Sequence, residues 1–221
     1  MNSQILTLIK KELLSEWRQK YAINGMILYL ASTIFVCYMS FGLKAGTIDV
    51  VTWNALFWII ILFTAVNSVA KSFIQDKEGR MLYYYSIASP ESIIISKIVY
   101  NALLLIVLSA IGILMYSFVM GNPIQDLPLF LLAVFLGAIG FSSGLTMISG
   151  IASKASNSGT LMAVLSFPVI IPLVLMVIRL SKNAMDGIDR SASSDEIITL
   201  VAINLIVGAA SYLLFPYLWR S

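Results

Sequence analysis

Six long stretches of the chain contain no charged residue, and this pattern restricts the fold more than any other feature of the sequence. Each stretch holds at least about 20 residues, the length that a helix needs to cross the apolar core of a bilayer at about 1.5 Å per residue. Because a backbone in lipid must satisfy its own hydrogen bonds, we expect each stretch to be helical. The six stretches are Tyr21–Leu43, Val50–Ala70, Ile98–Gln125, Leu127–Ser153, Ala155–Ile178 and Ile197–Trp219.

The composition favours the same fold class. Of the 221 residues, 59% are apolar and 11% are charged, whereas soluble domains carry roughly 45–50% apolar and about 25% charged residues. The alternative, a large soluble protein with buried core helices, lacks the charge to cover its surface. We therefore predict an all-α integral membrane protein that forms a single membrane domain over residues 1–221. Its spans are expected at roughly 21–43, 51–74, 90–120, 127–152, 156–180 and 197–219.

The distribution of Lys and Arg predicts the orientation in the membrane, because these residues are enriched on the cytoplasmic side. With the N-terminus inside, the outer side receives only Lys44, Arg179, Lys182 and Arg190 of the 14 Lys and Arg residues. Both termini are therefore expected in the cytoplasm. The first apolar stretch is too long for the core of a signal peptide, so no cleavable signal peptide is expected.

Residues 1–20 are predicted to form an amphipathic helix that does not cross the membrane. Leu6, Ile9, Leu13 and Trp17 recur at helical spacing and give the helix one apolar face. An apolar face of this kind, with basic neighbours, suits a helix that lies flat at the cytoplasmic surface of the membrane. The alternative is a solvated tail.

The sequence argues against several classes of function. There is no histidine, and all 11 acidic residues lie outside the six uncharged stretches, so no general acid–base pair, carboxylate proton relay or His/carboxylate metal site is expected. No phosphate-binding loop motif occurs. Cys37 has no partner within the chain, and the scattered basic residues with a net charge of +3 argue against binding of nucleic acid. We therefore expect no catalytic residue, no metal and no cofactor on this chain.

Three asparagines lie within predicted spans. Asn67, Asn101 and Asn204 can either line a path for a substrate or form hydrogen bonds between helices. Hydrogen bonding between helices is the more common role of such amides, and we expect it here.

Two spans carry residues that affect helix packing. Gly137, Gly140 and Gly144 lie in the fourth span, where small residues allow close approach of helices. These glycines could serve a contact between subunits or a contact between helices that move against each other. The alternative is ordinary packing within the bundle. Pro168 and Pro172 in the fifth span remove two helix hydrogen bonds and predict a bend, which is either a moving part or a fixed kink.

The longest polar interruption in the first two-thirds of the chain is QDKEGRMLYYYSIASP, residues 75–90. Simple connections between neighbouring helices need only about 2–8 residues. This one places charges first and then Met81–Tyr85, which are predicted to form a short helix at the membrane surface. Ser89 is expected to cap the third span and Pro90 to occupy its first turn. Because apolar, tyrosine-rich patches flanked by charge are typical of protein interfaces, we expect a cytoplasmic partner here.

Two stretches resemble the permease subunits of ABC-2-type transporters, and within that group the B subunits of the haem exporter of cytochrome c maturation. QDKEGRMLYYYSIASPESIIISK is similar to the acidic run with glycine, apolar helix and proline that precede the third span in that family. GFSSGLTMISGIASKASNSGTLMAVLSFPVIIPLVLM is similar to its Gly-rich fourth span, short basic turn and fifth span with two prolines. Arg80, Leu82 and Ala88 depart from the family pattern, in which a small hydroxyl residue, an acid and a second proline are usual.

The resemblance implies a permease subunit of the bacterial inner membrane that pairs with a second copy of itself. Two copies of a separate ATPase subunit would bind ATP, and the coupling residues would be Asp76, Lys77, Glu78, Gly79, Arg80, Leu82, Tyr83, Ser89 and Pro90. It further implies a haem-handling membrane protein and a periplasmic haem chaperone as partners, with haem bound on those subunits. The alternatives are an ABC-2-type permease for lipid, glycan or drug, and a membrane scaffold that transports nothing.

Overall fold

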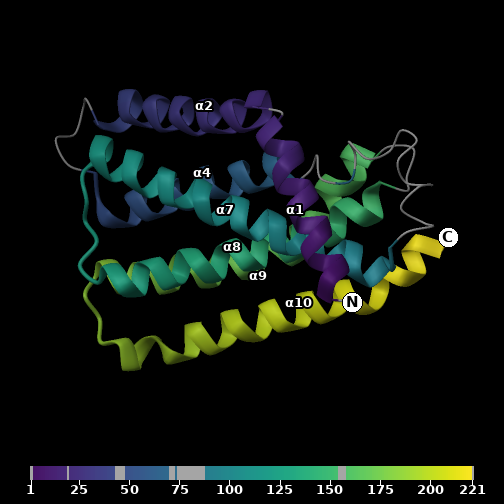
Figure 1. The fold of residues 1–221 in the computed structure, drawn as a ribbon. Coiled ribbons are helices and arrows are strands. Elements are labelled where there is room, and N and C mark those ends of the chain that lie inside the picture. Colours follow the sequence, from purple (N-terminus) through teal and green to yellow (C-terminus); the bar gives the residue numbers. More distant parts are fainter. Residues whose placement is uncertain are drawn as a thin grey trace.

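The computed structural model describes residues 2–18, 20–42, 48–69, 73, 88–153 and 158–220, and within these ranges all regular structure is helical (Figure 1). Six of the described helices are long and apolar enough to cross a membrane, which confirms the predicted fold class. The elements are α1 (Asn2–Arg18), α2 (Lys20–Cys37) with the π-helical turn η1 (Tyr38–Gly42), α4 (Val50–Val69), α7 (Pro90–Met120), α8 (Leu127–Ala152), α9 (Ser158–Met185), the 3₁₀ turn η2 (Arg190–Ser193) and α10 (Ser194–Arg220).

The spans run side by side, with α2 and α10 on opposite sides of the bundle (Figure 1). The central helix is α8. In its most apolar 18-residue segment 78% of the residues are buried, compared with 17% in the corresponding segment of α2 and 11% in that of α10. Helix α1 crosses the spans near the end at which both termini lie, and we call this end the α1 end. The opposite end carries residues 121–126 and 186–193, and we call it the loop end.

The connection between the fifth and sixth spans is shorter than the polar sequence suggested. The predicted spans 156–180 and 197–219 leave residues 181–196 as a connecting loop. In the structure, helix α9 continues to Met185 and α10 begins at Ser194, so much of this range is helical. The polar residues find partners inside the bundle: Trp58 Nε1 donates to Ser181 Oγ at 2.7 Å, and Asn54 Nδ2 donates to the carbonyl of Ile178 at 2.9 Å. Asn183 Nδ2 also donates to Ser193 Oγ at 3.0 Å.

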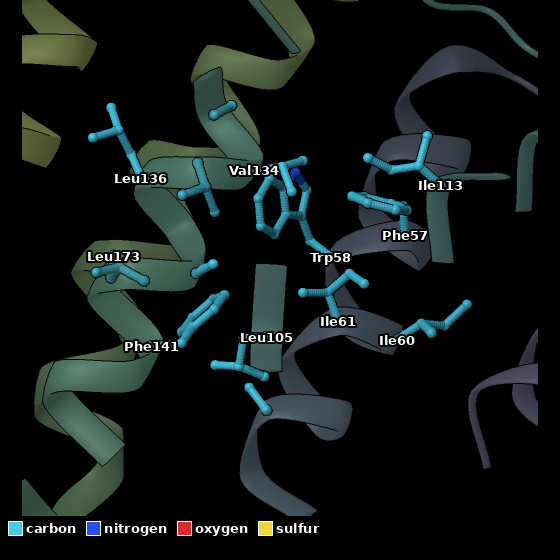
Figure 2. Close-up of a cluster of buried hydrophobic side chains, with 14 of the residues drawn as sticks. Phe57, Trp58, Ile60, Ile61, Leu105, Ile113, Val134, Leu136, Phe141 and Leu173 are labelled. Atoms are coloured by element: carbon cyan, nitrogen blue, oxygen red, sulfur yellow. The ribbon is translucent and has the colours of Figure 1, made fainter. Parts of the chain in front are cut away.

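Aromatic side chains fill the core between α4, α7 and α8. Figure 2 shows Trp58 between Phe57, which also belongs to α4, and Val134, which belongs to α8. The ring centroids of Trp53 and Tyr116 lie 4.6 Å apart, and Trp53 Nε1 donates to the carbonyl of Gly121 at 3.0 Å. Burial of these large rings is therefore combined with hydrogen bonds for their polar atoms, as buried tryptophan requires.

The three glycines of α8 face helices of the same chain. A Cβ atom on Gly137 would lie 3.0 Å from the Trp58 ring, and one on Gly144 would lie 2.9 Å from Val169 Cγ1. A Cβ atom on Gly140 would collide with Leu173 Cδ1 and lie 2.5 Å from Asn204 Oδ1. The absence of side chains at these positions lets α4, α9 and α10 approach α8 closely.

We expect Gly140→Ala to destabilise the protein by about 1–3 kcal/mol, because the added methyl group overpacks the contact with Leu173 and Asn204. The measurement is the thermal unfolding midpoint of the purified chain in detergent. Gly208→Ala in α10 is the matched control, since a Cβ atom there meets nothing within 4 Å. A Gly140→Ala variant as stable as the control would contradict this packing.

At the loop end, an ion pair connects the start of α8 to the turn before α10. Arg190 donates through Nε to Asp126 Oδ2 at 2.7 Å and through Nη2 to Asp126 Oδ1 at 2.9 Å. Asp126 also caps α8 by accepting from the Leu129 amide at 3.1 Å. The hydrogen bond from Arg190, followed by the one from Leu129, holds the pKa of Asp126 below its ordinary value.

Because the pKa of Asp126 is lower in the folded chain than in the unfolded chain, its contribution to stability is present at neutral pH and is lost as the pH falls through the folded pKa. We therefore expect Asp126→Asn to lower the melting temperature at pH 7, and expect the difference from the wild-type chain to shrink below about pH 4. Melting curves of both chains between pH 3 and pH 7 measure this. A difference that does not change with pH would contradict the assigned role of the carboxylate charge.

Candidate coupling site at the α1 end

A small hydrophobic cluster, separate from the main core, lies at the α1 end. It consists of buried Phe73, Ile93, Ile94 and Phe215, and we call it the α1-end cluster. The ring centroids of Phe73 and Phe215 lie 5.4 Å apart, so the cluster joins the chain after α4 to the C-terminal part of α10. Leu8 of α1 and Ala88 also pack against it.

The α1-end cluster holds both ends of the predicted partner-binding segment. Phe73 precedes that segment and is 1% exposed, whereas Ala88 follows it and packs on the same cluster. Residues 74–87 lie outside the described part of the chain. This applies to the predicted helix Met81–Tyr85 and to seven of the predicted coupling residues, namely Asp76, Lys77, Glu78, Gly79, Arg80, Leu82 and Tyr83.

The predicted start of the third span is confirmed. Helix α7 begins at Pro90, and Ser89 is its N-cap, with extended backbone angles of φ −71° and ψ 144°. The Ser92 amide donates to Ser89 Oγ at 3.3 Å, and Ser89 Oγ donates to Ser92 Oγ at 2.9 Å. Glu91 lies in the first turn, where a negative charge complements the positive end of the helix dipole. The cap, the proline and the acidic residue together fix the start of α7 directly after the predicted partner-binding segment.

The structure adds a charged contact that sequence reasoning missed. Lys97 lies on α7 about two turns beyond Pro90, and its Nζ is 3.4 Å from Oε1 of Glu12 on α1. The side chain of Lys97 is only 6% exposed and that of Glu12 is 18% exposed. Glu12 lies outside the predicted apolar face of the N-terminal helix, and Lys97 is 85 positions away from it in the sequence. The sequence shows only a lysine seven residues after Pro90, within the predicted third span.

Helix α1 itself has two different faces. Leu8 and Glu12 point toward the rest of the chain, whereas Leu6 and Leu13 of the predicted apolar face are exposed. An exposed apolar face on a helix that crosses the spans is what an interfacial helix requires. The side chain of Trp17 lies outside the described part of the structure.

Helix α7 is also tied to the central helix just beyond Lys97. Asn101 Nδ2 donates to Thr146 Oγ1 at 2.9 Å, and Ser142 Oγ donates to the carbonyl of Ile98 at 2.6 Å. Asn204 Nδ2 in α10 donates to the carbonyl of Leu136 at 3.0 Å. The predicted hydrogen bonds between helices are therefore confirmed for Asn101 and Asn204.

For Asn67 the prediction was wrong. This residue is exposed on α4, and its Nδ2 donates to the carbonyl of Phe63 in the same helix at 2.9 Å. A side-chain amide on an outward-facing surface can reach only the carbonyl one turn back, so it forms no link between helices.

The other predicted site residues lie away from the α1-end cluster. Gly137, Gly140 and Gly144 face α4, α9 and α10 within the bundle. Helix α9 continues without a break through Pro168 and Pro172, although each proline removes one backbone donor. Of the predicted residues that the structure describes, Ser89 and Pro90 alone lie at the α1 end.

The described residues contain no group of three His, Cys, Asp or Glu side chains that could hold a metal ion. What the described residues provide at the α1 end is a capped helix start, an apolar cluster and a buried ion pair. Such an arrangement suits the transfer of movement from a bound partner into α7 and, through Asn101 and Ser142, into α8.

No curated protein matches this chain. The sequence profile of the ABC-2 type transporter family matches residues 3–175. The matched range begins in α1 and ends within α9, so it includes the capped start of α7 and the ion pair between Glu12 and Lys97. Members of this family are the membrane subunits of transporters driven by ABC ATPases. The chain therefore belongs to the ABC-2 type transporter family and is a multi-pass membrane permease subunit that works with an ABC ATPase.

Proposed function

We propose that the ABC ATPase docks on residues 75–87 at the cytoplasmic face of a bacterial inner membrane, and that its movement enters the permease at the start of α7. The observation that carries this proposal is the anchoring of Phe73 and Ala88 in one apolar cluster beside the capped start of α7. Phe73 and Ala88 flank residues 75–87, which we call the docking segment, and both pack on this cluster. A displacement of the docking segment would therefore be transmitted to Ser89 and Pro90.

The orientation is part of the proposal. The excess of Lys and Arg on the side of residues 71–97 supports a cytoplasmic α1 end. The loop end, with Asp126 and Arg190, would then face the periplasm. We further propose that the working unit contains two copies of this permease and two copies of the ATPase, so that ATP is bound by the partner subunit.

For the cargo, we propose export of haem or ATP-driven release of a haem-loaded periplasmic chaperone during cytochrome c biogenesis. Support comes from the likeness of residues 75–97 and 140–176 to haem-exporter B subunits. The chain contains no histidine, and histidine is the usual protein ligand of haem iron. Haem ligation is therefore assigned to a haem-handling membrane protein and to the chaperone rather than to this chain.

To test ATPase docking, we predict that the double reversal Asp76→Lys with Glu78→Lys lowers the amount of ATPase that co-purifies with the permease by about tenfold. The expected cause is loss of charge complementarity at the interface, where like charges cost several kcal/mol. Pull-down from detergent-solubilised membranes with a tagged permease measures the retained ATPase. Asp189→Lys at the loop end is the matched control, because Asp189 is exposed and lies at the opposite end of the bundle. Full retention of ATPase by the double variant would exclude these residues as the docking site.

To test the cargo, we predict that cells lacking this chain lose covalently bound haem in their c-type cytochromes, as measured by haem staining of membrane proteins. Wild-type permease restores the staining, and the Asp76/Glu78 double variant does not. The purified chain alone is expected to bind no stoichiometric haem. Normal c-type cytochromes in the deletion strain, with the ATPase still bound to the permease, would favour lipid, glycan or drug as the cargo. A chain that retains no ATPase would favour a scaffold.

A further inference from the structure

We propose that Lys97 is a positioning residue that joins α1, the chain before the docking segment and α7 into one coupling unit. The proposal rests on the proposed function, in which the ATPase acts on residues 75–87. It adds that the movement reaches α1 as well as α7, and that one buried ammonium group is responsible.

Two of the contacts of Lys97 reach segments other than its own helix. Its Nζ lies 3.4 Å from Glu12 Oε1 on α1 and 4.9 Å from the centroid of the Phe73 ring. Phe73 stands directly before the docking segment and is itself buried in the α1-end cluster. An ammonium group over an aromatic face is attracted by the ring, and more strongly when it is desolvated. Three segments that are distant in sequence therefore meet at a single charge.

Burial makes this contact selective. With 6% of its side chain exposed, Lys97 has little access to water and depends on Glu12 to offset the cost of desolvation. Glu12 also contacts Lys11 at 3.0 Å, but Lys11 lies on α1 itself and is 34% exposed. Of these two contacts of Glu12, the one with Lys97 connects α1 to α7. Loss of either Glu12 or Lys97 removes the charge attraction that offsets the cost of burying this pair between the two helices.

The position of Lys97 along α7 explains why the contact bears on coupling. The helix begins at Pro90, so Lys97 lies between the capped end and the bonds from Ile98 and Asn101 to α8. Lys97 therefore belongs to the part of α7 that lies between its capped start and these hydrogen bonds to α8. Helix α1, whose other face exposes Leu6 and Leu13, would move along the membrane surface with the start of α7.

The first experiment measures hydrogen–deuterium exchange in the full-length chain in lipid nanodiscs. Lys97→Met keeps a long, unbranched side chain, one atom shorter than that of lysine, and removes its charge. We expect Lys97→Met to accelerate exchange of α1 amides by about tenfold and to leave α8 amides unchanged. Glu12→Gln should have a similar effect, and the double variant should exceed neither single variant, because both remove one interaction. Lys10→Met is the matched control. Lys10 lies on α1, as Glu12 does, and is exposed, so its loss should leave α1 exchange within about twofold of wild type.

The second experiment uses the complex of permease and ATPase. In the wild-type complex, ATP with orthovanadate should change the protection of both α1 and residues 90–100. In the Lys97→Met complex the change should be confined to residues 90–100, and Lys97→Arg should restore the response of α1.

Two outcomes would overturn the proposal: unchanged α1 exchange in the Lys97→Met chain, or a nucleotide response that still reaches α1 in the Lys97→Met complex. Failure of the proposed function would look different, since no ATPase would be retained while the exchange experiment on the chain alone still reports on the ion pair.

Discussion

Close packing against α8 is the constraint on which the rest of the bundle depends. Lipid tails are as apolar as leucine, so helices in a membrane gain little from hiding apolar side chains from one another. What they gain instead is contact between complementary surfaces, and Gly137, Gly140 and Gly144 provide a surface on which other helices come near the α8 backbone. The central position of α8 follows from this surface, since α4, α9 and α10 all pack against it.

Polar side chains are used sparingly, and several of those that are buried connect two helices. Asn54 and Trp58 tie α4 to α9, Asn101 ties α7 to α8, and Asn204 ties α10 to α8. Bonds of this kind contribute about 1 kcal/mol or less each in membrane proteins, so they select the partner of each helix more than they supply stability. The charged pairs lie at the two ends, with Arg190 and Asp126 at the loop end and Lys97 and Glu12 at the α1 end.

Several features of the α1 end follow from local sequence. Ser89 and Pro90 predicted the start of α7 because a cap and a first-turn proline act within a few residues of each other. At the loop end, by contrast, the end of α9 was predicted too early. Ser181 and Asn183 are polar and so suggested a loop, but in the structure they form hydrogen bonds with Trp58 and Ser193. The pairing of Glu12 with Lys97 was not predicted at all. Each charge has an ordinary local explanation, and only the crossing of α1 over α7 brings them together.

The sequence by itself determined that the chain is helical and that six of its helices are long and apolar enough to cross a membrane. It could do so because the cost of placing a charge or an unpaired backbone group in lipid depends on composition along a single segment. The tertiary structure alone decided which helix faces meet, that Phe73 and Ala88 share one cluster, and that Lys97 reaches α1. These contacts depend on side chains that are far apart in the sequence, and their geometry exists only when the helices are packed.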